Sequence, residues 1–274
     1  MLESTDFSLS GDILTLHGAG SQRQIRLRSP TRGWIRRLAP PYWRRSVLSG
    51  SREAAIRGAW TSLVAAVAGA REVAWLTPLE RLFLRENKLL QARAAKALGI
   101  AIPRTAVVSQ RALIPADLGD SLVVKPLGAS TFTDSEGTER VVWARELGRD
   151  SPALDSMDGA PFLVQRLLKA DRHLRAVTVN EEVWLCELDA EDMPTDWRRD
   201  ERAHESFVTA SEPSVERDAI RLATSLGVGY SSQDWIVAEG VSYFLDLNPA
   251  GQWLFLPDEV GSAVTNSIAS WLIG

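Results

Sequence analysis

The chain has 274 residues, enough for one large or two smaller domains, and its net charge of −4 with 45% hydrophobic residues is ordinary for a globular protein. A single cysteine, Cys186, excludes an internal disulfide framework; it lies in an apolar run and is interpreted as a core thiol rather than a nucleophile. No stretch has the roughly 18 apolar residues of a membrane span, and the first residues lack the features of a secretory signal. We therefore expect a cytoplasmic protein with no membrane partner.

The first hundred residues carry one alternating pattern and two helical patterns. Residues 12–18 and 23–29 alternate polar and apolar side chains, which predicts a hairpin. From Ser49 to Ala70 apolar residues recur at helical spacing, which predicts an amphipathic helix capped by Ser49 or Ser51. Further expected features are a break at Pro40-Pro41, a strand at 72–76, and a helix from about Pro78 to Leu98 ended by Gly99.

An arginine-rich segment lies between Gln22 and Arg57, where Glu53 is the single acid. Such a block of charge can bind nucleic acid or an acidic peptide, or it can form a solvated face paired with carboxylates elsewhere. Arginine without lysine favours defined recognition of carboxylates, so nucleic acid is not an expected partner. The arginines are Arg23, Arg26, Arg28, Arg32, Arg36, Arg37, Arg44, Arg45, Arg52 and Arg57.

The remainder alternates strands with a few helices, which predicts an α/β or α+β fold rather than a bundle or a sandwich. The apolar run at 121–127 precedes a polar loop at 128–139, and a polar stretch covers 190–206. The other expected elements are strands near 105–109, 140–146 and 160–168, hairpins at 173–189 and 232–248, and helices at about 213–226 and 257–271.

The final hairpin carries the strongest chemical signal. Asp246 and Asn248 are two residues apart and share a strand face, and a short hairpin can bring Asp234 alongside them. Carboxylate and amide oxygens suit Mg²⁺. The alternative is a turn in which Asn248 hydrogen-bonds its own backbone; the offset of Asp234 favours the metal.

Two lysines and a polar loop are further candidates. Lys125 lies in an apolar strand, where an unpaired ammonium is costly, so phosphate is a natural partner; the alternative is an edge lysine with its head in water. Lys88 by itself reads as an exposed helix lysine. Asp196 and Arg198 lie in a polar loop around one tryptophan; Arg198 could clamp a carboxylate, or the loop could be ordinary surface.

Five segments of the chain carry a family resemblance: ENKLLQARAAKALGIAIPRT, SLVVKPLGAS, PFLVQRLLKADRHLRAVTV, TDWRRD and SSQDWIVAEGVSYFLDLNPAGQW. Together, and in this order, they resemble the ATP-grasp superfamily, and specifically the ligases that cyclise ribosomal peptides of the microviridin type (graspetides). The resemblance covers roughly residues 75–256 and implies an ATP-grasp fold. Two subdomains (105–169 and 170–274) would clasp ATP after a shortened N-terminal pre-ATP-grasp region (1–104).

The resemblance also implies a role for each candidate residue. ATP and Mg²⁺ would be the cofactors, and a ribosomal precursor peptide with an acidic core containing Thr/Ser or Lys would be the substrate. A homodimer is a family expectation. Lys88 and Lys125 would contact ATP, Gln165 to Leu168 would face the adenine, and Asp171 or His173 would lie near the ribose. Arg175 would reach the phosphates and the reacting carboxylate, Asp234, Asp246 and Asn248 would hold Mg²⁺, and Asp196 and Arg198 would orient the peptide.

The chemistry so implied is activation of a substrate carboxylate as an acyl phosphate, followed by attack of a hydroxyl or amine to give an ester or amide. The chain departs from the family at Asp246, where Glu is usual, at Arg166 in place of Glu, and at His173 in place of an acid. Two other readings remain open. One is a ligase that joins free amino acids, or an amino acid to a peptide; the other is an impaired nucleotide-binding protein that acts through its basic N-terminal surface.

Overall fold

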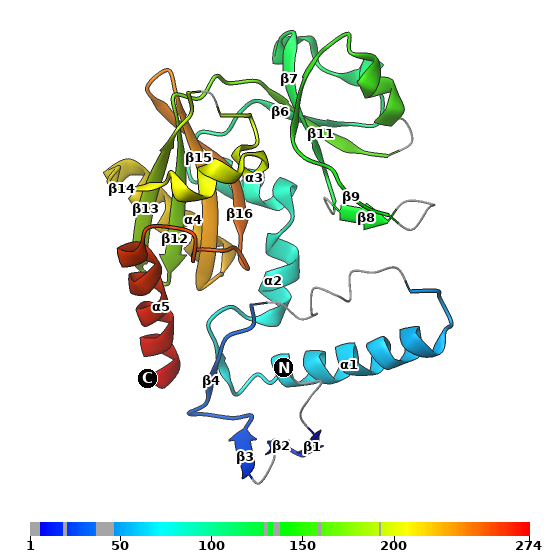
Figure 1. Cartoon of the computed structure of the whole chain (residues 1–274), viewed down its shortest axis with the longest axis vertical. Helices are drawn as coiled ribbons and strands as arrows, with labels where there is room; N and C mark the ends of the chain where they lie inside the picture. Colours follow the sequence, from blue (N-terminus) through cyan, green and yellow to red (C-terminus); the bar gives the residue numbers. More distant parts are fainter. Residues whose placement is uncertain are drawn as a thin grey trace.

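The computed structural model describes residues 6–18, 21–36, 47–128, 131–133, 138–157, 160–191 and 193–274 (Figure 1). The described residues combine several strands with a few helices, as the sequence predicts for an α/β or α+β protein. The helices of eight or more residues are α1 (Arg52–Ala68), α3 (Lys88–Ala97), α4 (Pro213–Leu226) and α5 (Asp258–Ile273). The described part contains no helix that is long and apolar enough to span a membrane.

An antiparallel five-stranded sheet forms the centre of the C-terminal half, in the order β14-β13-β12-β15-β16. One face packs on α4 through Leu174 and Trp235, and the other packs on α5 through Val177. Because side chains alternate along a strand, Arg175 and Asp234 lie on the α5 side of the sheet. The strands are β12 (Arg172–Val179), β13 (Glu182–Asp189), β14 (Val208–Ala210), β15 (Tyr230–Ala238) and β16 (Val241–Asn248).

A smaller antiparallel sheet, in the order β10-β7-β11-β6, lies beside the upper end of the large sheet in Figure 1. Its own core contains Leu122, Val164 and Leu154. The chain enters and leaves this small sheet at adjacent points, because Thr105 at the start of β6 pairs with Gln165 near the end of β11. The strands are β6 (Thr105–Val108), β7 (Ser121–Pro126), β10 (Arg145–Gly148) and β11 (Phe162–Arg166); β8 (Thr131–Thr133) and β9 (Glu139–Val141) form a separate hairpin.

The N-terminal residues form a three-stranded antiparallel sheet and a short parallel pair. The expected hairpin at 12–18 and 23–29 is confirmed as β2 and β3, with β1 added as a third strand. Thr77 joins this region to the large sheet, because its Oγ1 accepts hydrogen bonds from the N–H groups of Gly229 (3.1 Å) and Tyr230 (3.3 Å). The strands are β1 (Asp6–Ser10), β2 (Ile13–Gly18), β3 (Ser21–Arg26), β4 (Arg32–Gly33) and β5 (Ala74–Trp75).

Two helical predictions need correction. The helix expected from Pro78 to Leu98 is two helices, α2 (Leu79–Arg85) and α3, because the Asn87 side chain caps α3 by accepting hydrogen bonds from Leu89 and Leu90. Helix α1 begins after Ser51 as predicted, but it is not strongly amphipathic. Ile56 is exposed, and Ala68 is the one buried residue of α1.

The remaining predictions for the C-terminal half are confirmed, with small shifts in bounds. Both hairpins form, with turns at Asn180 (φ 50°) and at Glu239-Gly240 (φ 52° and 74°). The expected strand at 140–146 is split between β9 and β10. The break at Pro40-Pro41 and the arginines at 37, 44 and 45 lie outside the described residues, as does part of the polar loop at 128–139.

Candidate active site

Three charged side chains form a row across the large sheet. Arg175 on β12 is directly opposite Asp234 on β15, and Asp234 is directly opposite Asp246 on β16. Asn248 follows two residues later on β16, opposite Ser232. The register therefore brings together Arg175 and the three residues predicted as metal ligands on one face of adjacent strands.

Arg175 and Asp234 form a buried ion pair, with 2.5 Å between Arg175 Nη1 and Asp234 Oδ1. Their side chains are 7% and 12% exposed, so water screens the pair little. Burial opposes the charge of Asp234, but Arg175 and Arg198 outweigh this effect and hold the pKa of the carboxyl below its usual range. Arg175 also donates through Nη2 to the carbonyl of Gln252 at 3.1 Å.

Asp196 and Arg198 lie at a 3₁₀ turn formed by Trp197–Arg199, and Asp196 is buried there. Its carboxylate accepts two hydrogen bonds from the guanidinium of Arg198, at 2.8 Å from Nε and 3.3 Å from Nη2. Arg198 Nη1 lies 3.6 Å from Asp234 Oδ2. Burial opposes the charge of Arg198, yet Asp234 and Asp196 together raise the pKa of its guanidinium. Arg198 is thus fixed in orientation while still half exposed.

Asp246 and Asn248, two of the predicted metal ligands, both have polar contacts at the end of β16. Asp246 Oδ1 lies 3.6 Å from Lys88 Nζ. The Oδ1 atom of Asn248 accepts a hydrogen bond from the N–H of Ala250 at 2.8 Å, so the turn that the sequence left as an alternative is present. A carbonyl oxygen has two lone pairs and can accept a second partner. No group of three or more His, Cys, Asp or Glu side chains suited to a metal occurs among the described residues.

Asp234, Asp246 and Asn248 nevertheless fit a hard cation. They present two carboxylates and one amide from paired strands, and oxygen donors of this kind are what Mg²⁺ prefers. Both carboxylate oxygens of Asp234 already face cations, because Oδ1 pairs with Arg175 and Oδ2 faces Arg198. Asp246 and Asn248 therefore stand as the more available donors.

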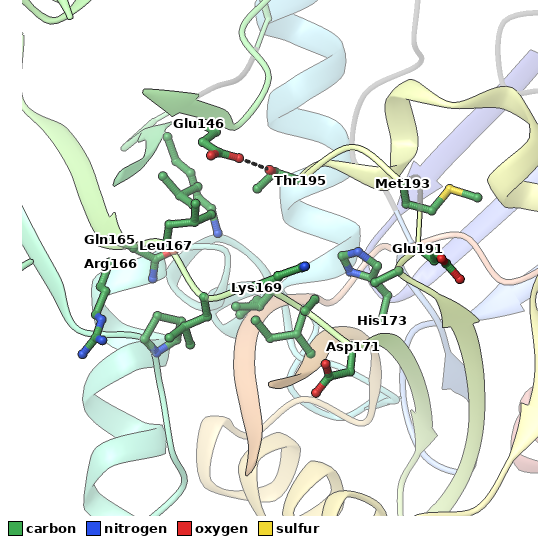
Figure 2. A pocket seen from close by; sticks show the side chains of 18 of the residues that line it. Glu146, Gln165, Arg166, Leu167, Lys169, Asp171, His173, Glu191, Met193 and Thr195 are labelled. Carbon is green, nitrogen blue, oxygen red and sulfur yellow. Dashed lines mark hydrogen bonds between the residues drawn. The ribbon is translucent and has the colours of Figure 1, made fainter. Parts of the chain in front are cut away.

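A cavity of about 850 Å³ lies between the small sheet and the large sheet (Figure 2). This volume is within the range of small-molecule and cofactor sites. Five of the six residues predicted to bind the cofactor line it; Lys88 instead lies beside it at Asp246. The five are Lys125, Gln165, Leu168, Asp171 and His173.

Burial changes the acid–base properties of two residues in this cavity. It lowers the pKa of the Lys125 ammonium, against the opposing attraction of Asp246. It also lowers the pKa of His173, although Asp234 and Asp196 act in the other direction. His173 is consequently biased toward its neutral form. Lys125 is half-buried, so its ammonium has lost part of its hydration, and an anionic ligand would compensate for that loss.

Glu146 and Thr195 close one side of the cavity and were not among the predicted site residues. Thr195 Oγ1 donates a hydrogen bond to Glu146 Oε2 at 3.4 Å, joining β10 of the small sheet to the 190–206 stretch (Figure 2). The two residues are 49 positions apart in the sequence. No local motif marks either residue, so the sequence offered no signal for this contact.

Gly251 was likewise not singled out as a site residue, although it belongs to the segment Asn-Pro-Ala-Gly-Gln-Trp. A Cβ atom at Gly251 would lie 2.4 Å from Ser232 Cβ and 3.3 Å from Arg175 Nη2. The hydroxyl of Tyr230 donates to the Gly251 carbonyl at 2.9 Å. A glycine lets this loop approach the sheet closely enough for the next carbonyl, that of Gln252, to reach Arg175.

No protein-family model matches the sequence, and the search of curated proteins gives no match. Solved structures are similar over almost the whole chain. A RiPP-associated ATP-grasp ligase from Chryseobacterium gregarium, in complex with ADP and a leader and core peptide, superposes with a TM-score of 0.81 at 20% identity, covering 98% of this chain and 84% of that one.

Two further structures agree. The macrocyclase MdnC from Microcystis aeruginosa MRC, bound with precursor peptide MdnA, gives a TM-score of 0.74 at 18% identity, covering 98% of this chain and 86% of that one. The ATP-grasp ligase PsnB, complexed with minimal precursor, Mg and ADP, gives 0.70 at 17% identity, with the same coverage of 98% and 86%. This chain therefore has the ATP-grasp fold.

Proposed function

We propose that this chain is an ATP-dependent carboxylate–amine/hydroxyl ligase that acts on a ribosomal precursor peptide. It would activate Asp or Glu side chains of the peptide as acyl phosphates and form ester or amide crosslinks, releasing ADP and phosphate. The observation that carries this proposal is the row of Arg175, Asp234 and Asp246, which lies beside a cavity lined by Lys125 between two sheets. Similarity to peptide-bound ligases over 98% of the chain supports it.

The proposed nucleotide site is the cavity between residues 105–169 and 170–274. Lys125 and Lys88 would bind phosphate oxygens, because both are cations at or beside the cavity. The segment from Gln165 to Leu168 would face the base, and Asp171 and His173 would lie near the ribose. Asp246 and Asn248, with Asp234, would hold Mg²⁺. When bound, MgATP would supply the phosphoryl group that makes the substrate carboxylate reactive.

The proposed peptide-orienting groups are Arg198 and its partner Asp196. Arg198 is half exposed and its guanidinium plane is fixed by the two hydrogen bonds to Asp196, which suits bidentate binding of a carboxylate. Arg175 would stabilise negative charge developing at the reacting centre, because it is already buried and held in place by Asp234 and Gln252. The chain's own residues would thus bind and orient the reactants without a covalent enzyme nucleophile.

Release of ADP that depends on a peptide substrate tests this function. A suitable peptide has an acidic core with Thr/Ser or Lys residues, and each bond formed should remove the mass of one water from it. We expect Asp246→Ala or Asn248→Ala to abolish turnover while the protein remains folded. Asp155→Ala, which removes a surface carboxylate paired with Arg111, serves as the control and should retain activity.

Each alternative predicts a different result in the same assay. Release of ADP with free amino acids and not with peptides would favour a ligase for small substrates. Nucleotide binding without any turnover would favour an impaired nucleotide-binding protein. Undiminished activity in Asp246→Ala would overturn the metal assignment.

We also propose a cytoplasmic location and a homodimer, the latter testable by light scattering of the purified chain.

A further inference from the structure

Gln91 on α3 is a buried polar residue whose side chain binds the backbone of β16. The side chain is 1% exposed. Its Nε2 donates to the carbonyl of Leu247 at 2.7 Å, and its Oε1 accepts from the N–H of the same residue at 3.0 Å. Two hydrogen bonds to one backbone unit fix both the distance and the rotation of the amide relative to the strand.

Strand β16 is the edge of the five-stranded sheet, so its outer backbone groups have no strand partner. Leu247 lies between Asp246 and Asn248, and its N–H and C=O point outward toward α3. The amide of Gln91 supplies the two hydrogen bonds that a sixth strand would supply at this position. A buried backbone unit is thereby satisfied at the point where the proposed metal ligands occur.

The side-chain amide of Gln91 also binds the backbone at the break between α2 and α3. Gln91 Nε2 donates to the carbonyl of Arg85, the last residue of α2, at 2.5 Å. Asn87 caps α3 immediately afterwards. Gln91 therefore joins the end of α2, the first turns of α3 and the edge strand through one side chain.

Lys88 lies three residues before Gln91 and shares its helix face. Its Nζ is 3.6 Å from Asp246 Oδ1, the residue next to Leu247. The side chains of this ion pair are 27% and 26% exposed, and partly exposed ion pairs contribute little to fixing a geometry. The buried amide contact one turn further along the helix is the stronger constraint on how α3 sits against β16.

We propose that Gln91 is a positioning residue that fixes Lys88 relative to Asp246 and Asn248, and so sets the geometry of the phosphate and metal site. This inference rests on the proposed function, in which Lys88 binds nucleotide phosphate. Gln91 itself touches none of the proposed ligand groups; it acts through the backbone of Leu247 and through the helix that carries Lys88.

A double-mutant cycle on MgADP binding to the full-length chain tests the inference. Gln91→Met replaces the amide by an apolar side chain of similar size, and Lys88→Met removes the ammonium. Calorimetry should show about tenfold weaker MgADP binding for each single variant, and the double variant should bind no more weakly than Lys88→Met. In the ligand-free protein, the backbone amide of Leu247 should exchange with solvent faster in Gln91→Met than in the wild type.

Gln233→Met is the matched control. Gln233 is a buried amide on β15 whose side chain faces α4, on the face of the sheet opposite to Asp234 and Asp246, where it donates to the carbonyl of Ala219 at 2.9 Å. This variant should unfold at a lower temperature yet bind MgADP like the wild type. An equal loss of affinity in Gln233→Met would attribute the effect to general destabilisation and overturn the inference.

Two other outcomes separate the inference from the function on which it rests. Losses that multiply in the double variant would show that Gln91 and Lys88 act independently, which overturns the inference alone. Unchanged MgADP binding by Lys88→Met would overturn the proposed role of Lys88, and the inference with it. Should Gln91→Met fail to fold, Gln91→Asn replaces it, because the shorter side chain cannot reach both groups of Leu247; the same pattern is expected.

Discussion

At the residue scale, Arg175 is held by three contacts that come from two other parts of the chain. Asp234 pairs with it across the strand, the Gln252 carbonyl accepts from its Nη2, and the ring of Phe255 lies 5.9 Å from its Cζ. The loop that supplies Gln252 and Phe255 can approach because Gly251 has no side chain. A buried guanidinium in a fixed orientation is suited to stabilising charge without first reorganising.

We predict that Gly251→Ala lowers the free energy of unfolding by about 1–3 kcal/mol and reduces the proposed ligase activity, because the added methyl would overlap Ser232 and displace the loop from Arg175. The control variant, Gly58→Ala, should change the free energy of unfolding in the opposite direction. Gly58→Ala lies on α1 with open space around its Cβ position, and alanine there should stabilise the helix by about 0.5–1 kcal/mol. Urea unfolding measures both; equal stability of Gly251→Ala and the wild type would contradict the close approach.

The interpretation of Cys186 as a core thiol is supported at the same scale. Its side chain is fully buried among residues packed on α5, and burial, with a smaller effect from Glu259, raises the pKa of the thiol to about 12. The thiol therefore stays protonated at neutral pH, and a nucleophilic role is not supported because the thiolate is the reactive form.

At the scale of elements, the break between α2 and α3 matters most for the candidate site. The periodic pattern from Pro78 to Leu98 continues through the break, so it predicts one helix. Asn87 interrupts it by taking an extended backbone conformation and capping the second helix. Lys88 is consequently the first residue of α3, which places it beside Asp246.

We predict that Asn87→Ala lowers the free energy of unfolding by about 1 kcal/mol, since two N–H groups at the start of α3 lose their acceptor. Asn266→Ala provides the comparison, because this asparagine is exposed in the interior of α5, where alanine is the better helix former. Chemical denaturation should show a loss for the first variant and no loss for the second. Equal responses would argue against a capping role for Asn87.

The predictability of these elements follows from the range of the interactions that determine them. Both C-terminal hairpins were predicted because Asn180 and Gly240 mark their turns locally. The pairing of Gln91 with Leu247 joins residues 156 positions apart, and no local pattern encodes it. The face shared by Asp246 and Asn248 followed from strand periodicity, whereas the pairing of Arg175 with Asp234 needed the strand register.

On the scale of the whole molecule, the cavity lies between two sheets, and the hydrogen bond from Thr195 to Glu146 is one contact that joins its two sides. The larger body, built on the large sheet, includes residues before 105, because Ala95 and Ile100 lie in the same core as Leu174 and Leu222. The small sheet has a core of its own. A ligand between the bodies would therefore bind the folded chain and not the unfolded one, which couples binding to stability.

We predict that MgADP raises the free energy of unfolding by about 3 kcal/mol when its free concentration exceeds Kd about a hundredfold. Lys125→Met should remove most of this gain without destabilising the ligand-free protein, because it replaces a poorly hydrated ammonium by an apolar group. Lys96→Met, on the exposed side of α3, should keep the full gain. Thermal unfolding with and without MgADP measures the stabilisation in each variant. A full gain in Lys125→Met would contradict the proposal that Lys125 binds phosphate.

The pairing of Thr105 with Gln165 has a consequence for the modular construction of the chain. Because β6 and β11 are neighbours, the chain leaves the larger body and returns to it at almost the same place, where Arg166 also donates to the carbonyl of Arg104 at 2.9 Å. The small sheet is thus an inserted module with closely spaced ends. Such a module can be exchanged between relatives without moving Arg175, Asp234 or Asp246, so the proposed base-facing wall of the cavity and the proposed reacting centre are free to diverge separately.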